Sequence, residues 1–349
     1  MLKVVTSNRG VSFRNISMDI VKVAARLGID ADFIDRLITP YEAVKRRLRV
    51  VIVMCADPLT AGSWVLLARD LKRSSVPNIF YTTVEGKINN KYLSPWMRDI
   101  NVVANTEYTA SRLREAGFTV LDVIHHGIDI EMIEKALRYR EAAVEYMRSF
   151  GVDPEKHTVV LTVSMSHPRK GFKLYDKVIE YVERRDPSIK FFIVTQSSGE
   201  RYFKQHTNLV ISKDFGGLPR ETVLALIASS HILASPSIAE GFGLPVLEAM
   251  ALGTPVVHAD LPPFREFSTG FSVRVTDVVY YDRVDVTGSG FIFEHHLYEP
   301  SEFGETLLQV VDMVRNRREE LENWRERSRK VAEQHSIYTL YPKLLRYVL

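Results

Sequence analysis

The chain is poor in the features that cross-link or anchor a protein. It contains one cysteine, Cys55, so a disulfide framework is excluded and an intracellular, cytoplasmic location is expected. No apolar run approaches the roughly 20 residues that a transmembrane helix needs. Residues 1–10 have the polarity of a first strand rather than of a signal peptide. Internal repeats and low-complexity tracts are also missing, so the composition is that of a globular protein with an ordinary core.

A large charge imbalance is missing as well, although the charge is unevenly distributed. The net charge is +3, but residues 1–130 hold 18 Lys and Arg against 13 Asp and Glu. The basic residues gather at 45–49 and around Arg69, Lys72 and Arg73. Solvated helix faces are the simplest interpretation. Peripheral contact with the anionic inner face of a membrane is a second one, and no nucleic-acid partner is predicted.

What is present is the pattern of two α/β domains. The chain of 349 residues is too long for one ordinary core. It is 46% hydrophobic and 26% charged. Short apolar runs typical of buried parallel strands alternate with helical segments. They lie at 50–54, 78–82, 101–104, 120–124, 158–163 and 191–195. We therefore predict two α/β domains, residues 1–150 and 151–335. Alternating Val and Tyr at 271–287 suggest an inserted hairpin.

The most informative stretch begins at residue 235. An apolar run, 231–235, reads as a short strand, after which the chain turns through two glycines and enters a helix at Pro245. Backbone N–H groups just ahead of a helix N-terminus bind anions, and glycines leave them open to a ligand. The sequence thus predicts an anion site formed by Gly241, Phe242, Gly243 and Leu244.

Two carboxylates, Glu240 and Glu248, bracket this loop. Taken alone, Glu248 could simply complement the helix dipole and Glu240 could be a solvated loop residue. However, the segment Glu240-Gly-Phe-Gly-Leu-Pro-Val-Leu-Glu248-Ala-Met-Ala-Leu-Gly-Thr-Pro-Val-Val257 resembles the Glu, seven residues, Glu signature of retaining glycosyltransferases, group 1 or family 4. The resemblance implies the GT-B fold, in which two doubly wound, Rossmann-like domains face each other across a cleft. It also implies that residues 336–349 cross back onto the first domain.

The resemblance also implies roles for individual residues. Glu248 would accept hydrogen bonds from the ribose of a nucleoside-diphosphate sugar, a UDP-sugar or GDP-sugar, and Glu240 would hold hydroxyls of the transferred sugar. Residues 164–171 resemble the family's phosphate motif, in which Lys170 and Gly171 match. Ser164 and Met165 replace its usual glycine and arginine, so Arg169 is the candidate for the missing cation. No cofactor and no metal are expected.

Two departures from the family and one further histidine concern the first domain. Its first loop retains a single glycine, Gly10, as the donor contact. Glu85 stands where several relatives carry a histidine that reaches the reacting sugar, and a surface-loop role for Glu85 is an equal alternative. His126 could be a catalytic base, but packing against the interdomain turn is the preferred interpretation.

The predicted function is retaining, metal-independent transfer of a sugar to an acceptor that the sequence leaves open: glycan, lipid, protein or small molecule. Three alternatives remain, namely a non-catalytic nucleotide-sugar binding or scaffold protein, a sugar-nucleotide epimerase and a glycan phosphorylase. The lost arginine, the single glycine of the first loop and the missing histidine favour the first of these.

Overall fold

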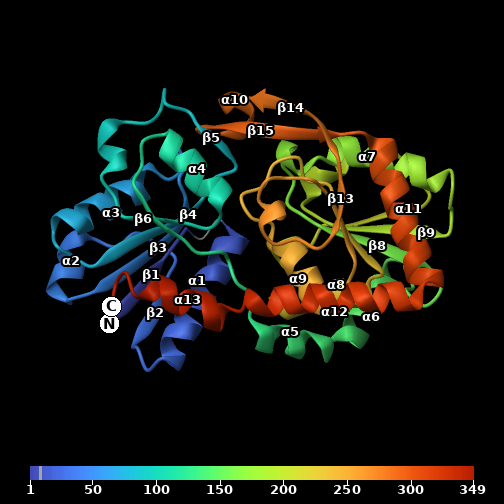
Figure 1. The fold of residues 1–349 in the computed structure, drawn as a ribbon, viewed down its shortest axis with the longest axis horizontal. Helices are drawn as coiled ribbons and strands as arrows, with labels where there is room; N and C mark the ends of the chain where they lie inside the picture. The colour runs from blue at the N-terminus through green and yellow to red at the C-terminus, as the bar shows by residue number, and fades with distance from the viewer. Residues whose placement is uncertain (8–9) are drawn as a thin grey trace.

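The computed structural model describes residues 1–7 and 10–349, so Asn8 and Arg9 of the expected first loop lie outside the described residues. Two α/β halves lie side by side along the longest axis of the molecule (Figure 1). Each half is built on a six-stranded sheet, and a third sheet of three strands joins them.

The first sheet has the strand order β2-β1-β3-β4-β6-β7, with all neighbours parallel. Helices cover both faces, so the central strand β4 is buried along its whole length and β3 is buried except at its ends, as expected for a parallel sheet. The strands are β1 (Leu2–Val5), β2 (Ala31–Ile34), β3 (Arg49–Cys55), β4 (Asn78–Thr83), β6 (Val102–Ala104) and β7 (Val120–Val123). The helices are α1 (Val11–Arg26), α2 (Pro40–Lys45), α3 (Gly62–Arg73), η1 (Pro95–Arg98) and α4 (Glu107–Glu115).

The second sheet has the order β10-β9-β8-β11-β12-β13 and is also parallel. Its strands are β8 (Thr158–Val163), β9 (Ile189–Val194), β10 (Leu209–Ser212), β11 (Ile232–Ser235), β12 (Val256–Ala259) and β13 (Phe271–Val273). The associated helices are η2 (Pro168–Lys170), α7 (Phe172–Glu183), η3 (Ser197–Tyr202), α8 (Arg220–Ser229), α9 (Leu244–Leu252), η4 (Phe264–Glu266), α11 (Pro300–Asn316) and α12 (Arg318–Gln334). The strand order reverses between β8 and β11, and ligands of doubly wound sheets bind at the carboxyl ends of strands at such a point.

The chain crosses between the domains at two adjacent places. Ile128 and Ser336 form a β-bridge, with hydrogen bonds from Ile128 N to His335 O (2.9 Å) and from Ile337 N to Ile128 O (3.0 Å). After the second crossing, α13 (Ile337–Leu345) packs in the core that contains α1, along the lower edge of Figure 1. The last helix of the chain therefore completes the first domain.

The cores divide earlier in the chain than the expected boundary at residue 150. Helices α5 (Ile130–Leu137) and α6 (Arg140–Ser149) bury Ile133, Ala136, Ala143 and Met147 in the second core. The chain has thus already left the first domain at Ile128. Gly151 and Pro154 lie in the loop between α6 and β8, which is a break between two elements of the second domain.

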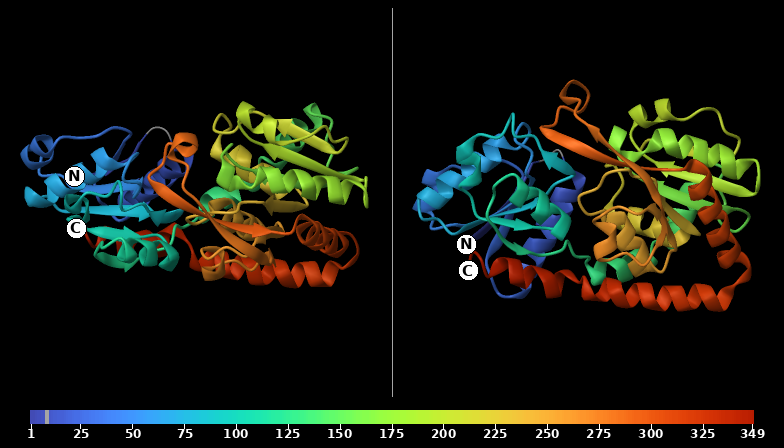
Figure 2. Two further views of the ribbon diagram at one scale, coloured as in Figure 1. Left: turned by 90° about the horizontal axis from the view of Figure 1, so that it is seen from above. Right: turned by 45° about the horizontal axis from the view of Figure 1, so that its top comes forward.

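The inserted hairpin is longer than its sequence pattern indicated. Residues 271–273 form β13 of the second sheet, and the hairpin consists of β14 (Val275–Tyr281), the short helix α10 (Val284–Thr287) and β15 (Phe291–Tyr298). β15 also pairs with β5 (Gly86–Ile88) of the first domain. Figure 2 shows this interdomain hairpin, residues 275–298, spanning both halves. It lies opposite the edge at which the two crossings meet.

These features confirm the prediction of an α/β protein with two doubly wound domains. Within the described part of the chain, no helix combines the length and the apolar character that spanning a membrane requires.

Candidate active site

The expected site residues lie in loops that follow strands of both sheets. Glu85 follows β4 of the first sheet, Arg169 and Lys170 lie in the loop after β8, and Glu240 follows β11. Because β8 and β11 flank the reversal in strand order, the second-domain loops share the position at which such sheets bind ligands. The fold therefore brings together residues that are up to 155 positions apart in the sequence.

Four charged side chains form one network between the domains. Arg169 is the centre: its Nη2 lies 2.8 Å from Glu85 Oε1 and its Nη1 lies 3.3 Å from Glu240 Oε2. Lys170 forms an ion pair with Glu240, whose Oε1 also accepts a hydrogen bond from Ser237 Oγ at 2.7 Å. Arg169, Lys170 and Glu240 are each about 10% exposed, so these ion pairs are shielded from solvent.

Burial perturbs each titrating member of the network differently. It opposes ionisation of Glu240, but Lys170 and Arg169 outweigh it and hold the pKa of Glu240 below its usual value. Glu85 has the weaker cationic environment, and burial raises its pKa. Burial and the neighbouring guanidinium of Arg169 lower the pKa of Lys170. Glu240 is therefore the firmly ionised acid of the network, and Glu85 is the acid that takes up a proton most readily.

The glycine-rich loop has the geometry of an anion site. Gly243 caps α9 with a φ of 93°, a conformation that favours glycine, and the helix begins at Leu244 with Pro245 in its second position. Within the described residues, the N–H groups of Gly241, Phe242 and Gly243 donate no hydrogen bond. They remain available at the positive end of α9.

This loop also touches the first domain. The carbonyl of Gly241 accepts hydrogen bonds from Asn105 Nδ2 at 3.2 Å and Thr106 Oγ1 at 3.4 Å. A Cβ atom on Gly241 would lie 1.9 Å from Thr83 Oγ1, so only glycine permits this approach. The side chain of Phe242 is buried, its ring centroid 4.7 Å from that of Phe267, so Phe242 can offer a ligand only its backbone.

Glu248 lies one helical turn further along α9 and is buried. Its nearest cation is Arg220, 3.8 Å away, which is itself held by both carboxylate oxygens of Asp19 at 2.8 and 2.9 Å. Burial raises the pKa of Glu248. No hydrogen bond to its carboxylate is found among the described residues, so its lone pairs are open to a ligand's hydroxyl groups.

Two residues singled out from the first domain are not part of the charged network. Gly10 caps the N-terminus of α1, and no contact links it to Glu85 or Arg169 in the described part of the chain. His126 donates from Nδ1 to the hydroxyl of Tyr81 at 2.8 Å, since that hydroxyl itself donates to Ile124 O. Burial lowers the pKa of His126 to about 3, which supports a packing role and not that of a base.

Sequence reasoning missed the contacts of the interdomain hairpin. Glu294 of β15 pairs with the Nε and Nη2 of Arg112, each at 3.0 Å, and accepts from Tyr108 Oη at 2.6 Å. Asp57 accepts hydrogen bonds from Ser289 Oγ (2.5 Å) and Gly290 N (2.9 Å). A lone acid in the apolar strand 291–298 was the available signal, because a buried carboxylate requires a partner.

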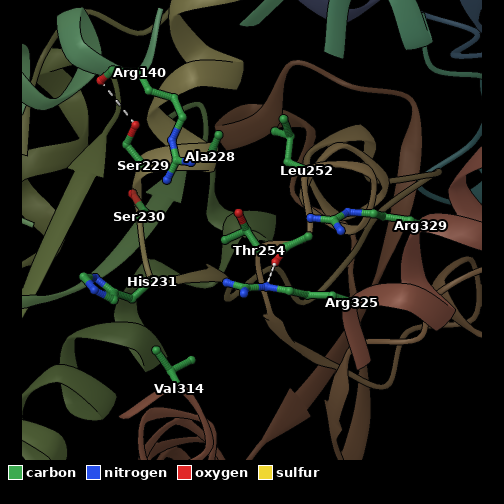
Figure 3. Close-up of a pocket in the computed structure, with 11 residues that line it drawn as sticks. Arg140, Ala228, Ser229, Ser230, His231, Leu252, Thr254, Val314, Arg325 and Arg329 are labelled. Carbon is green, nitrogen blue, oxygen red and sulfur yellow. Dashed lines mark hydrogen bonds between the residues drawn. The ribbon is translucent and has the colours of Figure 1, made fainter. Parts of the chain in front are cut away.

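A separate hollow of about 310 Å³ lies at the C-terminal ends of α8 and α9, and Figure 3 shows three arginines turning towards it. They are Arg140, Arg325 and Arg329. Arg325 Nε donates to Gly253 O at 3.0 Å, and a cation at a helix C-terminus is favourable. Arg325 therefore has a structural explanation, and the hollow lies at the opposite end of α9 from the glycine-rich loop.

No metal centre is evident. Among the described residues, no group of three or more His, Cys, Asp or Glu side chains is placed to hold a metal ion. An Asp-x-Asp sequence occurs at Asp30-Ala31-Asp32, but it lies at the start of edge strand β2, where Asp32 pairs with Lys3 at 2.6 Å.

Comparisons with known proteins agree with this arrangement. The family described as "Glycosyl transferases group 1" matches residues 145–331. "Uncharacterized glycosyltransferase 335" of Sulfolobus islandicus rod-shaped virus 1 is 29% identical over 286 residues, covering 76% of this chain and 78% of that protein. The D-inositol 3-phosphate glycosyltransferase of Segniliparus rotundus is 28% identical over 248 residues, 68% of this chain and 50% of that protein. The chain thus spans about half the length of the latter enzyme.

Solved structures show the same fold. A glycosyltransferase from Rickettsia africae superposes with a TM-score of 0.71 at 15% identity, covering 99% of this chain and 97% of the other. Anabaena HepE, solved with UDP and glucose, gives 0.66 at 13% identity, with 99% and 98% covered. With the family matching more than half of its length, this chain belongs to the group 1 glycosyltransferases and has their two-domain GT-B fold.

Proposed function

We propose that the protein is a retaining glycosyltransferase that moves a sugar from a nucleoside-diphosphate sugar to an acceptor without a metal ion. The observation that carries the proposal is the convergence of Arg169, Lys170 and the glycine-rich loop on one buried position beside Glu240. Fixed cations and a helix N-terminus together form a site for a diphosphate.

Donor binding would exchange one set of anions for another. Glu85 and Glu240 now neutralise Arg169 and Lys170. A diphosphate offers these cations stronger acceptors, and its arrival would release Glu240 to accept hydroxyls of the sugar. Glu248, which has no hydrogen bond from the described residues, would accept those of the ribose.

The bond changes follow from this placement. The bond between the sugar's anomeric carbon and the diphosphate oxygen breaks, and the diphosphate leaves with the electron pair. The acceptor oxygen bonds to the same carbon, and its proton passes to the departing diphosphate. Arg169, Lys170 and the loop N–H groups stabilise the negative charge that develops on the leaving group, which is the task a metal ion performs in other enzymes.

Retention of configuration is proposed from the segment between Glu240 and Glu248, which resembles that of retaining enzymes. Departure and attack on the same face of the sugar would give this outcome. The relative solved with UDP and glucose makes UDP-hexoses the first donors to test and GDP-hexoses the second.

The acceptor would bind the first domain, and its chemistry remains open between glycan, lipid, protein and small molecule. Helix α2 exposes Tyr41 and Val44 beside Lys45. If the acceptor is a lipid, this face is where a cytoplasmic enzyme would meet the membrane. Sedimentation with anionic and neutral vesicles would test that contact.

The alternative is a protein that binds nucleotide sugars without turning them over. It is favoured by Met165 at the usual arginine position and by the Glu85–Arg169 ion pair, which occupies a cation needed for catalysis. Donor hydrolysis separates the two possibilities because retaining transferases transfer sugar slowly to water.

The experiment is proton NMR of the protein with UDP- and GDP-hexoses, recorded early and repeated with chelator. We expect release of a sugar with the donor's anomeric configuration, unaffected by the chelator. An inverted anomer would contradict the retaining mechanism. Binding of the nucleoside diphosphate without turnover of any donor would favour the binding protein.

A further inference from the structure

Two histidines meet where the chain crosses between the domains. His125 follows β7, and His335 precedes the second crossing. Their rings are nearly parallel, with His125 Nδ1 3.0 Å from His335 Nε2. The outer nitrogens have partners too: His335 Nδ1 lies 2.9 Å from Val331 O, and His125 Nε2 lies 3.0 Å from Glu266 Oε2. Three hydrogen bonds thus form one continuous chain.

The protons of this chain can be counted. Both of its ends are acceptors, a carbonyl and a carboxylate, so its three hydrogen bonds require three N–H groups. Two neutral imidazole rings carry only two N–H groups. The third proton must therefore reside on the histidine pair or on Glu266.

The surroundings of Glu266 place that proton on the histidines. Glu266 accepts hydrogen bonds from the backbone N–H groups of Glu107 (2.9 Å) and Tyr108 (3.0 Å), at the N-terminus of α4. Although burial opposes its ionisation, these bonds and the one from His125 lower its pKa. Burial lowers the pKa of His335. The hydrogen-bond count thus places the positive charge on the histidine pair, beside the carboxylate of Glu266.

The histidine pair supports the glycine-rich loop. The ring of Phe242 lies 5.9 Å from that of His125 and 5.1 Å from that of His126. The ring of Phe242 also stacks on that of Phe267, the residue that follows Glu266. His125 therefore contacts both Glu266 and Phe242, and Phe242 belongs to the glycine-rich loop of the proposed diphosphate site.

We propose that His125 and His335 form a singly protonated pair that positions the glycine-rich loop, so that sugar transfer declines when the pair loses its third proton. His125 is a positioning residue here, because it acts through Glu266 and Phe242. The inference rests on the proposed function for its catalytic consequence. The protonation state of the pair can be measured without any donor.

The other charged and titratable groups around the pair have partners of their own. On η4, Arg265 is paired with Asp260. On α4, the side chain of Glu107 is 3.7 Å from Arg114. His126 stays neutral because burial lowers its pKa to about 3. Histidine is the side chain that ordinarily changes charge between about pH 5 and 8, so loss of the proton from the pair is expected as the pH rises.

Glu266→Gln is the sharpest test because it changes the proton count with little change in side-chain volume. An amide nitrogen at the position of Oε2 can donate to His125 Nε2, after which two neutral rings suffice for all three hydrogen bonds, although it no longer accepts from Glu107 N. His125→Gln is the second variant, to be used should the first fold poorly, and it removes one ring of the pair. His157→Gln is the matched control: His157 accepts from Asp153 N in the loop before β8 and belongs to no proposed site.

Two measurements are made on each full-length protein. The first is ring ¹⁵N NMR across the pH range without donor, and we expect the pair to release one proton in the wild type and none in Glu266→Gln. The second is turnover against pH of whichever UDP- or GDP-hexose the NMR experiment shows to be a donor. We expect turnover to decline on the alkaline side, about tenfold per pH unit, in the wild type and His157→Gln only.

Two neutral rings in the wild type at the pH of maximal turnover would overturn the proposal. An alkaline decline that persists unchanged in both Glu266→Gln and His125→Gln would also overturn it. If no donor is turned over, the ring titration still decides the charge of the pair. In that case the proposed function fails while the protonated pair stands or falls separately.

Discussion

Replacing Arg169 by Met separates its two roles in the charged network. The change removes the guanidinium and retains much of the side-chain volume. Glu85 then loses the cation at 2.8 Å, its single ion-pair partner among the described residues, while Glu240 keeps Lys170. We expect a loss of stability that originates at Glu85 and a loss of activity that does not.

The size of the stability loss is set by the protonation of Glu85. Breaking a buried ion pair from one side costs about 3–5 kcal/mol when the remaining charge cannot be neutralised. Glu85 can take up a proton instead. At pH 7 this costs at most about 3.4 kcal/mol for a carboxyl with the ordinary pKa of 4.5, and less here because burial already raises its pKa. We therefore expect a decrease of about 1–3 kcal/mol in the free energy of unfolding.

The pH dependence of this loss has a definite sign. In the variant, the pKa of Glu85 is higher in the folded state than in the unfolded chain. Stability must then fall as the pH rises above about 4.5. The decrease relative to wild type should be larger at pH 8 than at pH 5, and urea unfolding at the two values measures it.

The double variant Arg169→Met with Glu85→Gln is the decisive comparison. It leaves no buried charge at position 85, so most of the stability should return. Turnover should remain about 10²- to 10³-fold below wild type, the usual effect of losing one preorganised donor to a developing anion. Arg265→Met, which removes an exposed ion pair to Asp260 in the same domain, should change stability by no more than about 1 kcal/mol.

Recovery of both stability and turnover in the double variant would refute this reasoning. It would show that Arg169 only neutralises Glu85 and has no part in binding the diphosphate. Unchanged stability in the single variant would instead show that water, and not Arg169, stabilises the ionised carboxylate of Glu85.

Three further expectations concern other residues. Lys170→Ala should remove about 2–4 kcal/mol of transition-state stabilisation and so reduce turnover, whereas excess chelator should leave the wild type active. Initial rates test both expectations. Activity that chelator abolishes and magnesium restores would contradict the mechanism. Glu248→Gln should weaken nucleoside-diphosphate binding by about 1.5–3 kcal/mol in calorimetry, and unchanged affinity would remove Glu248 from the ribose. Because burial raises the pKa of Glu248, wild-type affinity should also fall with decreasing pH earlier than for an ordinary glutamate. Glu294→Gln should loosen the interdomain hairpin and speed its cleavage by protease, and an unaltered cleavage rate would show that Arg112 contributes little to holding it.

The sequence was most informative where a local pattern determines a local structure. Buried strands, the glycine turn before α9 and the loop containing Lys170 follow from apolar runs, glycines and a proline, and all form as expected. Arg169 was chosen from its neighbour alone, and the structure does turn it inward between Glu85 and Glu240.

The contacts that sequence reasoning missed join segments far apart in the chain. The pairs Asp19–Arg220 and Arg112–Glu294 are separated by 201 and 182 residues, and nothing in either local sequence names the partner. The boundary placed at residue 150 shows a related limit. Gly151 and Pro154 show where α6 ends, but not which core α6 packs against.

The position of α13 has a consequence for the order in which the protein folds. Ile337, Tyr341, Leu344 and Leu345 are completely buried in the core of the first domain. At about 1.5–3 kcal/mol each, their burial is comparable to the whole net stability of a typical domain. During synthesis, residues 1–127 leave the ribosome long before these side chains exist. The apolar face that α13 covers would therefore stay exposed on the first domain until the second domain has been made. Removing the last dozen residues should unfold the first domain.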